Sequence, residues 1–391
     1  PEGAREGASL NIEGGRIGRI LSAGAAPPSR IDATIDLGGL TLYPGFIDVH
    51  IHGAVGVDAM RANADDLRRV AAFLATRGVT GWLPTLVPGP AEDYRRAVAS
   101  IETLIRDQRR GDEPAIAAGA LALGVHYEGP FVNTAQCGAL RTEYFRTYKD
   151  ASSLDELATL PADLAALGDS PAAHMTTLAP EVGGGIALVG ELVSRGWIVS
   201  IGHTRASVET LDAALAAGAR HMTHFFNAMS PVHHRDPGVV GWGLVNDRVT
   251  CDVIADGVHS HPLALRLALR CKTPERLALI SDAVLPAGLG DGDYEVWGET
   301  ISVAAGRTRN ARGSIAGSVI TMLDAARTML SLGCAPQEVA RMASHNPARL
   351  LGVDQLTGSI EEGKRADLVA IDDEGRPRLT VVGGRVAFDA L

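Results

Sequence analysis

The stretch from residue 44 to residue 53 reads Pro44-Gly45-Phe46-Ile47-Asp48-Val49-His50-Ile51-His52-Gly53, and it decides how the rest of the chain is interpreted. Its apolar residues predict a buried strand, in which alternate side chains point to the same face. His50 and His52 therefore point the same way. A divalent metal readily uses imidazoles at this spacing. A pair of core histidines bonded to backbone explains an isolated His-x-His equally well, so the remaining sequence has to decide.

The composition indicates a globular protein with a large core. The chain has 391 residues, 46% of them hydrophobic, and a net charge of −10. No apolar run reaches the ~18 residues that span a bilayer, and the negative charge argues against binding to nucleic acid or anionic membranes. The four cysteines include no Cys-x-x-Cys pair and are too few for a disulfide framework. We therefore expect a cytoplasmic protein whose partner is a small molecule, with no nucleic acid and no membrane involved.

Both ends of the chain carry short apolar runs separated by glycine turns. Residues 8–42 and 366–386 show this pattern, which is typical of β-hairpins. We expect residues 1–43 and 345–391 to form one small discontinuous β domain, a β-sandwich built from both termini. The catalytic domain would span residues 44–344.

Between these ends, strand candidates alternate with helical stretches. Eight apolar runs end near His50, Pro84, His126, Thr176, His203, His224, Ala255 and Asp282. Apolar residues recur at helical spacing over 63–77, 91–109, 185–195, 207–217 and 318–332. This alternation implies a parallel sheet, and eight units favour an α/β fold of the (β/α)8 TIM-like barrel type over an open doubly wound sheet. No Gly-x-Gly-x-x-Gly follows the first strand, which weakens a nucleotide-binding alternative.

Residues of metal-binding type fall at the carboxyl ends of five of these strands. They are His50, His52, Glu128, His203, His224 and Asp282. The carboxyl ends of barrel strands meet at one face, where the chemistry of this fold takes place. Any one of these residues has an ordinary explanation as a strand-end residue bonded to the backbone. All six together are best explained by a metal-activated hydrolase.

The order and flanks of these residues closely resemble the amidohydrolase superfamily and, within it, the N-acetylglucosamine-6-phosphate deacetylases. The resemblance covers nearly the whole chain. Segments shared across the superfamily lie near the end, at residues 344–349 and 358–369. The other matching segments are residues 44–53, 128–131 (Glu-Gly-Pro-Phe), 202–204, 223–229 (containing Phe-Asn-Ala-Met), 254–259 and 281–283.

The resemblance implies a role for each candidate residue. Glu128, His203 and His224 would bind one divalent metal, and His50 and His52 would bind a second, which some members lack together with this histidine pair. Asp282 would act as the general base and then as the general acid. Positions that hold the sugar phosphate or face the substrate correspond to Asn227, Ala228, Arg235, His259, Ala139, Ile315 and Gly317. Arg235 would come from the other subunit of a homodimer.

The implied function is metal-dependent deacetylation of N-acetylglucosamine 6-phosphate to glucosamine 6-phosphate and acetate. The metal would lower the pKa of bound water from about 15.7 toward ~7, and Asp282 would carry the proton to the departing amine. We expect one or two ions per chain, zinc first, with iron, manganese or cobalt as alternatives. Two alternative functions stay open. One is a related amidohydrolase acting on another N-acyl sugar, such as N-acetylgalactosamine 6-phosphate, or on a small amide; the other is a catalytically silent binding relative.

One position departs from the pattern of the family. Members carry a histidine twelve residues after the metal-binding glutamate, where it polarises the acetyl carbonyl, and this chain has Leu140 there. Leucine cannot donate a hydrogen bond, and removing one such donor typically lowers the rate by ~10²–10³. The second metal, a donor such as Arg141 or Tyr144, or a different acylated substrate would each explain the change. We hypothesise that the second metal polarises the carbonyl, because the intact His50/His52 pair coincides with the missing histidine.

Overall fold

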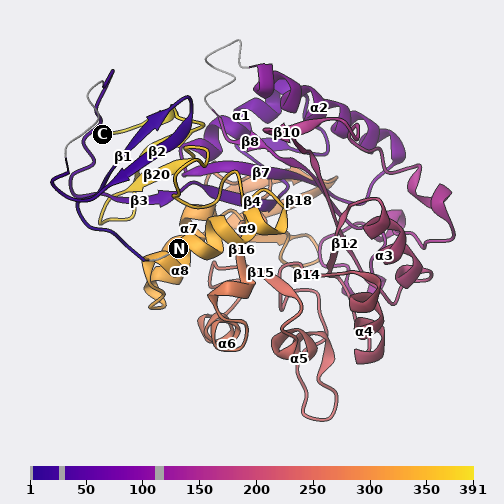
Figure 1. Ribbon diagram of the computed structural model, residues 1–391. Helices are drawn as coiled ribbons and strands as arrows, with labels where there is room; N and C mark the ends of the chain where they lie inside the picture. The colour runs from indigo at the N-terminus through magenta and orange to yellow at the C-terminus, as the bar shows by residue number, and fades with distance from the viewer. Residues whose placement is uncertain (1–2, 26–30, 111–118) are drawn as a thin grey trace.

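A computed structural model describes residues 3–25, 31–110 and 119–391, and a parallel β-barrel lies at its centre (Figure 1). Ile51 pairs with Ala283, just past the last barrel strand, so the barrel is nearly closed. The predicted (β/α)8 fold class is confirmed. The eight strands in order around the barrel are β4 (Phe46–Ile51), β7 (Val79–Leu86), β9 (Gly124–Glu128), β12 (Ala173–Leu178), β13 (Ile198–Ile201), β14 (His221–Met222), β15 (Thr250–Ile254) and β16 (Leu277–Ile280).

Helices pack around the outside of these strands. In the first of these helices, α1, the side chain of Asn63 caps the N-terminus by accepting the Asp66 N–H. Leu67, Val70 and Leu74 are buried on one face of the helix. Between β9 and β12 the chain instead forms three short 3-10 turns and the hairpin of β10 (Ala165–Leu167) and β11 (Ser170–Pro171). The outer helices are α1 (Ala64–Ala75), α2 (Ala91–Arg110), α3 (Gly185–Ser194), α4 (Val208–Ala217), α5 (Gly238–Val245), α6 (Pro262–Lys272) and α7 (Met322–Ser331).

Strands from both ends of the chain form an antiparallel sheet beside the barrel (Figure 1). Its order is β22 (Arg385–Asp389), β21 (Pro377–Val382), β20 (Leu368–Ile371) and β3 (Thr41–Pro44). The hairpin of β1 (Ser9–Glu13) and β2 (Arg16–Leu21) is connected to the C-terminal segment by pairing of Arg16 with Arg365. Because β3 ends at Pro44 and β4 begins at Phe46, this sheet leads directly into the first barrel strand.

Several elements were not predicted from the sequence. The strands β17 (Gly292–Val296), β18 (Glu299–Ala304) and β19 (Arg307–Asn310) form a separate antiparallel sheet between β16 and α7. After α7 come α8 (Pro336–Ala340), a π-helical turn (Arg341–His345) and α9 (Asn346–Leu350), which packs against β4 and β16. Shorter strands are β5 (Gly53–Ala54), β6 (Val57–Asp58) and β8 (Leu121–Ala122). Within the described residues, no helix has the length and apolar character needed to cross a membrane.

Candidate active site

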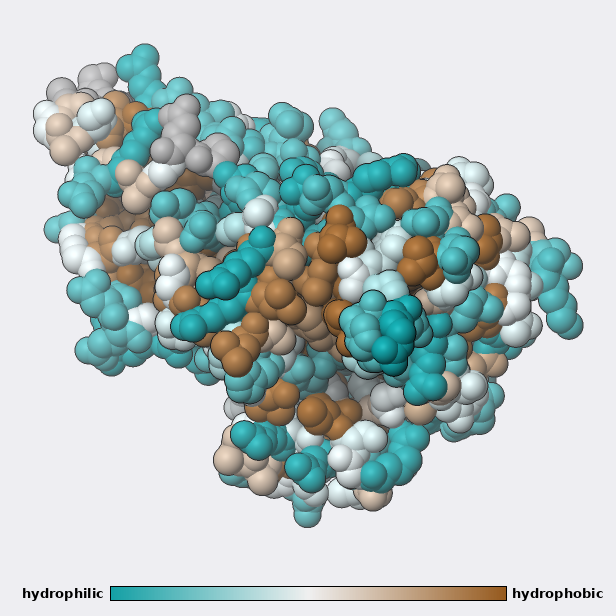
Figure 2. Space-filling model, turned by 90° about the horizontal axis from the view of Figure 1, so that it is seen from below, coloured by the Kyte–Doolittle hydropathy of each residue, from teal (hydrophilic) through white to brown (hydrophobic). Residues whose placement is uncertain are grey.

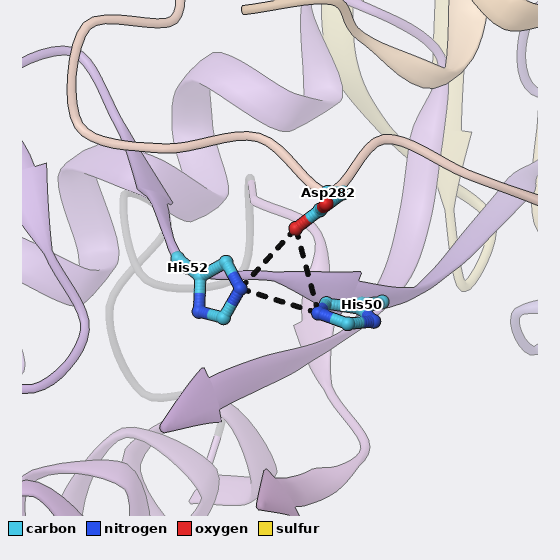
Figure 3. A group of neighbouring side chains, drawn as sticks. All are labelled: His50, His52 and Asp282. Atoms are coloured by element: carbon cyan, nitrogen blue, oxygen red, sulfur yellow. Dashed lines mark hydrogen bonds and ion pairs between the residues drawn. The ribbon is translucent and has the colours of Figure 1, made fainter. Parts of the chain in front are cut away.

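Three side chains that could bind a metal ion, called metal-ligand side chains below, meet where the first and last barrel strands end (Figure 3). His50 and His52 come from β4 and its end, and Asp282 lies two residues after β16. The Nε2 atoms of the two histidines are 3.2 Å apart. Asp282 Oδ1 lies 3.5 Å from the Nε2 atom of His50 and 3.2 Å from that of His52. The strand alternation predicted for the two histidines does bring both rings to one point.

A second group of three ligands lies next to the first. Glu128 is the last residue of β9, and His203 and His224 each lie two residues after a strand, β13 and β14. Glu128 Oε1 is 2.9 Å from His203 Nε2 and 3.0 Å from His224 Nε2. The two imidazole nitrogens are 3.0 Å apart.

The Glu128 carboxylate, which belongs to the second group, also lies close to the two histidines of the first group. Its Oε2 is 3.3 Å from His52 Nε2, and its Oε1 is 3.7 Å from His50 Nε2. All six side chains are buried. The six residues that the sequence placed at five separate strand ends therefore surround one small volume.

The backbone at three of these residues is unusual. The φ angles of His203, His224 and Asp282 are +48°, +32° and +50°. Residues with a side chain rarely adopt such angles, at a cost of about 1–3 kcal/mol each, and those that do cluster at functional sites. At each position the chain turns sharply just past the strand and leaves the side chain at the mouth of the barrel.

The charges of the two groups suit a divalent cation. Burial works to lower the pKa of His52, but hydrogen bonds to Asp282 and Glu128 outweigh it and raise that pKa to about 10. Burial works to raise the pKa of Glu128, yet its hydrogen bonds to His203 and His224 hold it well below the usual value. Several imidazole nitrogens thus converge on carboxylates that favour positive charge. A metal ion fits this donor set, since imidazole and carboxylate are ligands that zinc, iron, manganese and cobalt accept.

The loop that contains Leu140 lies against one of the metal-ligand histidines. His203 Nδ1 donates to the Gln136 carbonyl oxygen at 2.6 Å, which leaves Nε2 free to accept. Leu140 itself is 3% exposed and packs in the main hydrophobic core. The Arg141 guanidinium lies 4.6 Å from the centre of the Tyr144 ring and 3.5 Å from the Pro88 carbonyl oxygen. Both proposed substitute donors are therefore in contact with each other.

Some of the predicted substrate residues lie beside the metal-ligand groups. Asn227 donates to the His224 carbonyl oxygen at 3.1 Å, in the turn that contains Ala228. Gly317 approaches Asp282 so closely that a Cβ atom there would lie 2.9 Å from the Asp282 carbonyl oxygen. Its φ of +59° is a second reason for glycine.

The other predicted substrate residues make contacts of a different kind. Ile315 is exposed, and the carbonyl oxygen of Ala139 accepts from Arg312 at 3.2 Å. His259 Nδ1 lies 2.6 Å from the Asp256 carboxylate, in the turn after β15. Arg235 is exposed in the loop before α5, where its guanidinium lies 2.7 Å from His234 Nε2. Among the described residues, no metal-ligand side chain contacts Arg235.

Two buried carboxylates that support the site were missed in the sequence. Asp252 in β15 accepts the backbone N–H of His224 and lies 3.0 Å from His221 Nε2. Asp48 in β4 accepts the Ser281 hydroxyl at 2.5 Å and so fixes the residue before Asp282. Burial raises the pKa of Asp48 to about 7, although hydrogen bonds from Ser281 oppose the rise. A charged residue inside an otherwise apolar strand was the available signal for both.

Trp297 is a further residue that the sequence did not indicate. It lies in the turn between β17 and β18, and its ring meets the His52 ring edge-on with centres 5.1 Å apart. No pattern in the sequence predicts this contact, because it depends on how the β17–β19 sheet folds over β4.

Asp252→Ala is expected to destabilise the fold. The change leaves two buried donors without an acceptor, the backbone N–H of His224 and the ring of His221, at roughly 1–3 kcal/mol each. Urea unfolding of the metal-free protein measures the loss. Asp155→Ala, which removes an exposed carboxylate, is the matched control and should change the stability by no more than about 0.5 kcal/mol. Equal stability of the two variants would contradict the supporting role of Asp252.

Comparison with known proteins places these features in a wider group. The profile of the Amidohydrolase family matches residues 41–387. The chain is 35% identical over 382 residues to the N-acetylglucosamine-6-phosphate deacetylase of Bacillus subtilis (strain 168), covering 97% of this chain and 92% of the relative. It is 39% identical over 332 residues to the N-acetylgalactosamine-6-phosphate deacetylase of Escherichia coli O157:H7, covering 85% and 83%.

Solved structures agree with these sequence matches. The N-acetylglucosamine-6-phosphate deacetylase of Thermotoga maritima superposes with a TM-score of 0.83 at 30% identity, covering 97% of this chain and 94% of that one. A mutant of the Mycobacterium smegmatis enzyme, in complex with N-acetyl-D-glucosamine-6-phosphate, superposes with a TM-score of 0.82 at 33% identity and the same coverage.

Proposed function

Because this chain belongs to the N-acetylglucosamine-6-phosphate deacetylase family of the amidohydrolases, we propose that its metal-ligand site deacetylates N-acetylglucosamine 6-phosphate, releasing glucosamine 6-phosphate and acetate. One observation carries the proposal. Two groups of three metal-ligand side chains, joined by the Glu128 carboxylate, meet at the carboxyl ends of the barrel strands. A silent binding relative has no need for this arrangement, nor for the unusual backbone angles that hold it.

The residues have distinct roles in this proposal. Glu128, His203 and His224 hold one divalent ion, and His50 and His52 hold a second, with zinc first and iron, manganese or cobalt as alternatives. Ions bound there would supply Lewis-acid activation of water and of the amide carbonyl. Asp282 takes the proton of the attacking water and passes it to the departing amine, which leaves poorly unless it is protonated. The Gln136 carbonyl oxygen fixes the tautomer of His203, so that Nε2 would be free to bind an ion.

Removal of metal is expected to abolish the reaction. We expect dialysis against a chelator to stop acetate release from N-acetylglucosamine 6-phosphate, and added zinc, iron, manganese or cobalt to restore it. Metal analysis alongside the assay should find two ions per chain in the active protein. Full activity after the metal has been removed, or no turnover with any of these ions, would contradict the proposed function.

The sugar epimer is a second question, raised by the similarity to the galactosamine enzyme. The same assay with N-acetylgalactosamine 6-phosphate gives the ratio of the two kcat/KM values. A ratio that favours the galactosamine substrate would assign the chain to the alternative function. Turnover of small amides, but of neither sugar phosphate, would point to a different amidohydrolase.

The sugar phosphate is proposed to be held by Asn227, Ala228 and His259, with Arg235 provided by the partner subunit of a homodimer. The position of Arg235 in an exposed loop, away from its own metal-ligand groups, agrees with this arrangement. Its planar fork suits phosphate, because it gives paired charge-assisted bonds. Arg235→Ala is expected to raise KM roughly tenfold or more with a smaller change in kcat.

Mixing two inactive or weakened variants tests where Arg235 acts. A mixed dimer of Arg235→Ala and Asp282→Asn subunits contains one site with an intact Asp282 and an intact Arg235 from the partner. We expect the mixture, after dissociation and reassociation, to regain a low KM. If Arg235 acts within its own chain, mixing leaves the kinetics of each variant unchanged.

Exposed apolar residues around α5 and α6 support the proposed homodimer. Leu263 and Leu267 on α6 are 66% and 44% exposed, Val245 on α5 is 80% exposed, and Val232 in the loop before α5 is 55% exposed. These helices lie on the underside of Figure 1, the face drawn in Figure 2. Apolar residues gather near a hollow in the middle of that face, and polar residues cover most of its outline (Figure 2). Such patches commonly mark protein–protein contacts.

The enzyme is proposed to work in the cytoplasm. All four cysteines are free thiols, and two of them, Cys251 and Cys334, are buried. Free cysteines suit a reducing compartment.

A further inference from the structure

A cavity of about 340 Å³ lies at the end of the barrel opposite to the metal-ligand groups. The first residues of four consecutive strands line it: Ile198 of β13, His221 of β14, Thr250 of β15 and Leu277 of β16. His203, His224 and Asp282 follow the last residues of three of the same strands. The volume falls within the range of about 300–1,000 Å³ that small-molecule sites occupy.

Three arginines line this cavity. Arg220 directly precedes β14, Arg248 lies two residues before β15, and Arg349 belongs to α9. Arg220 Nη1 donates to the Leu215 and Ala219 carbonyl oxygens at 2.5 Å and 2.7 Å, which holds its guanidinium in place. The guanidinium of Arg248 makes no hydrogen bond or ion pair within the part of the chain that the structure describes.

Two acids close to these arginines are engaged elsewhere: Asp247 precedes Arg248 in the chain, and the carbonyl oxygen of Glu275 accepts from Arg349 at 3.0 Å. Asp247 pairs with Arg276 at 3.6 Å, and Glu275 pairs with Arg341 at 3.9 Å. No carboxylate in the described residues forms an ion pair with any of the three cavity arginines. In a chain with a net charge of −10, three guanidinium groups without acidic partners around one cavity indicate a site for an anion.

The residues that line the cavity indicate which class of anion fits it. A phosphate group carries about two negative charges and three acceptor oxygens, which suits several guanidinium forks better than a single carboxylate does. Trp197, Val199 and Leu350 form apolar walls next to the charged groups. In a small organic phosphate, such as a sugar phosphate, the phosphate group can contact the arginines while the organic part contacts the apolar residues.

A short chain of contacts joins the cavity to the metal-ligand groups. His221 lines the cavity, and its Nε2 lies 3.0 Å from Asp252 Oδ2. The other carboxylate oxygen of Asp252 accepts the backbone N–H of His224. A ligand that moves His221 therefore also moves the acceptor that fixes a metal-ligand residue.

We propose that this cavity is a regulatory site for a small organic phosphate, separate from the site where the substrate reacts. Binding at the cavity acts through His221 and Asp252 on the position of His224. The binding itself is independent of the proposed deacetylase function, whereas the effect on turnover rests on that function.

Calorimetry with glucose 6-phosphate tests the binding, because this sugar phosphate has no acetamide group to hydrolyse. We expect a binding event whose affinity falls roughly tenfold or more in Arg220→Ala/Arg248→Ala. Arg248→Ala alone, which disturbs no hydrogen bond, should show a smaller fall in the same direction and guards against misfolding of the double variant. Arg19→Ala/Arg95→Ala removes two exposed arginines of β2 and α2 and should bind like the unchanged protein. Binding that is the same in all variants would overturn the proposal.

Kinetics then test the regulatory effect. At saturating N-acetylglucosamine 6-phosphate, glucose 6-phosphate should change kcat of the unchanged protein and of Arg19→Ala/Arg95→Ala, but not of Arg220→Ala/Arg248→Ala. Competition at the catalytic site raises KM alone, and that result in every variant would overturn the regulatory role. If no preparation releases acetate with any metal, the proposed function fails, while the calorimetry still decides whether the cavity binds a phosphate.

Discussion

Asp282→Asn is expected to lower kcat for acetate release by about 10²–10⁴-fold, the range typical of a lost general acid–base. The Asp282 carboxylate lies within 3.5 Å of His50 and His52, at the point where both metal-ligand groups meet. An asparagine of nearly the same shape can neither accept the proton of the attacking water nor pass it to the amine. Because Glu128, His203 and His224 are unchanged, the ion that they hold should stay bound.

Three measurements separate this role from a structural one. Steady-state kinetics give kcat and KM, metal analysis gives the ions per chain, and thermal unfolding reports on the fold. We expect kcat to fall while KM and folding change little. Asp155→Asn, at an exposed position, serves as the matched control. An Asp282→Asn enzyme that works within tenfold of the unchanged rate would remove Asp282 from its proposed role.

Replacing both histidines of the first group, as His50→Gln/His52→Asn, is expected to leave one ion per chain and to lower kcat by roughly 10²–10³-fold. This is the typical effect of losing one group that stabilises the developing oxyanion. In the family that group is a histidine, and here Leu140 packs into the core at the same position. Arg141 lies over the Tyr144 ring and next to the Pro88 carbonyl oxygen, so both alternative donors pack against each other in the loop that follows Leu140. The variant therefore tests our hypothesis that a second ion would polarise the acetyl carbonyl.

The number of ions per chain and the rate of acetate release have to be measured in the same preparation. Mass spectrometry of the metal content, paired with acetate release, should show the loss of one ion together with the loss of rate. His261→Asn is the control, because this exposed histidine caps α6 and asparagine also serves as an N-cap. Full activity with a single ion would make His50 and His52 accessories, and the carbonyl would then need another partner.

Apolar runs and turn residues were enough to predict the barrel and the position of six candidate site residues at its strand ends. His203, His224 and Asp282 were expected at strand ends, and each lies two residues past a strand, because a buried run followed by a sharp turn has few other outcomes. Contacts made by other parts of the chain could not be predicted in this way. Trp297 reaches His52 only because the β17–β19 sheet brings it there. Residues 292–310, which form this sheet, were not predicted to be strands.

Two groups of expectations stay predictions. One is the division into a β domain of residues 1–43 and 345–391 and a catalytic domain of 44–344. The other is the role of each site residue, above all Arg235, whose partner would lie in another chain. Asp252 shows why such roles are hard to read in advance: the sequence shows a charge in an apolar strand, but its acceptor role depends on the loop that follows β14.

The direct passage from β3 into β4 has a consequence for biosynthesis. Among the described strands, β3 has a single neighbour, β20, which begins at Leu368. Until β20 has been synthesised and has left the ribosome, β3 is unpaired, and the strand that leads to His50 and His52 lacks its anchor on that side. A product that terminates before Leu368 would remain in this immature state. Synthesis of the chain through β20 is therefore a condition for a rigid histidine pair, and products truncated before it are not expected to mature into an active protein.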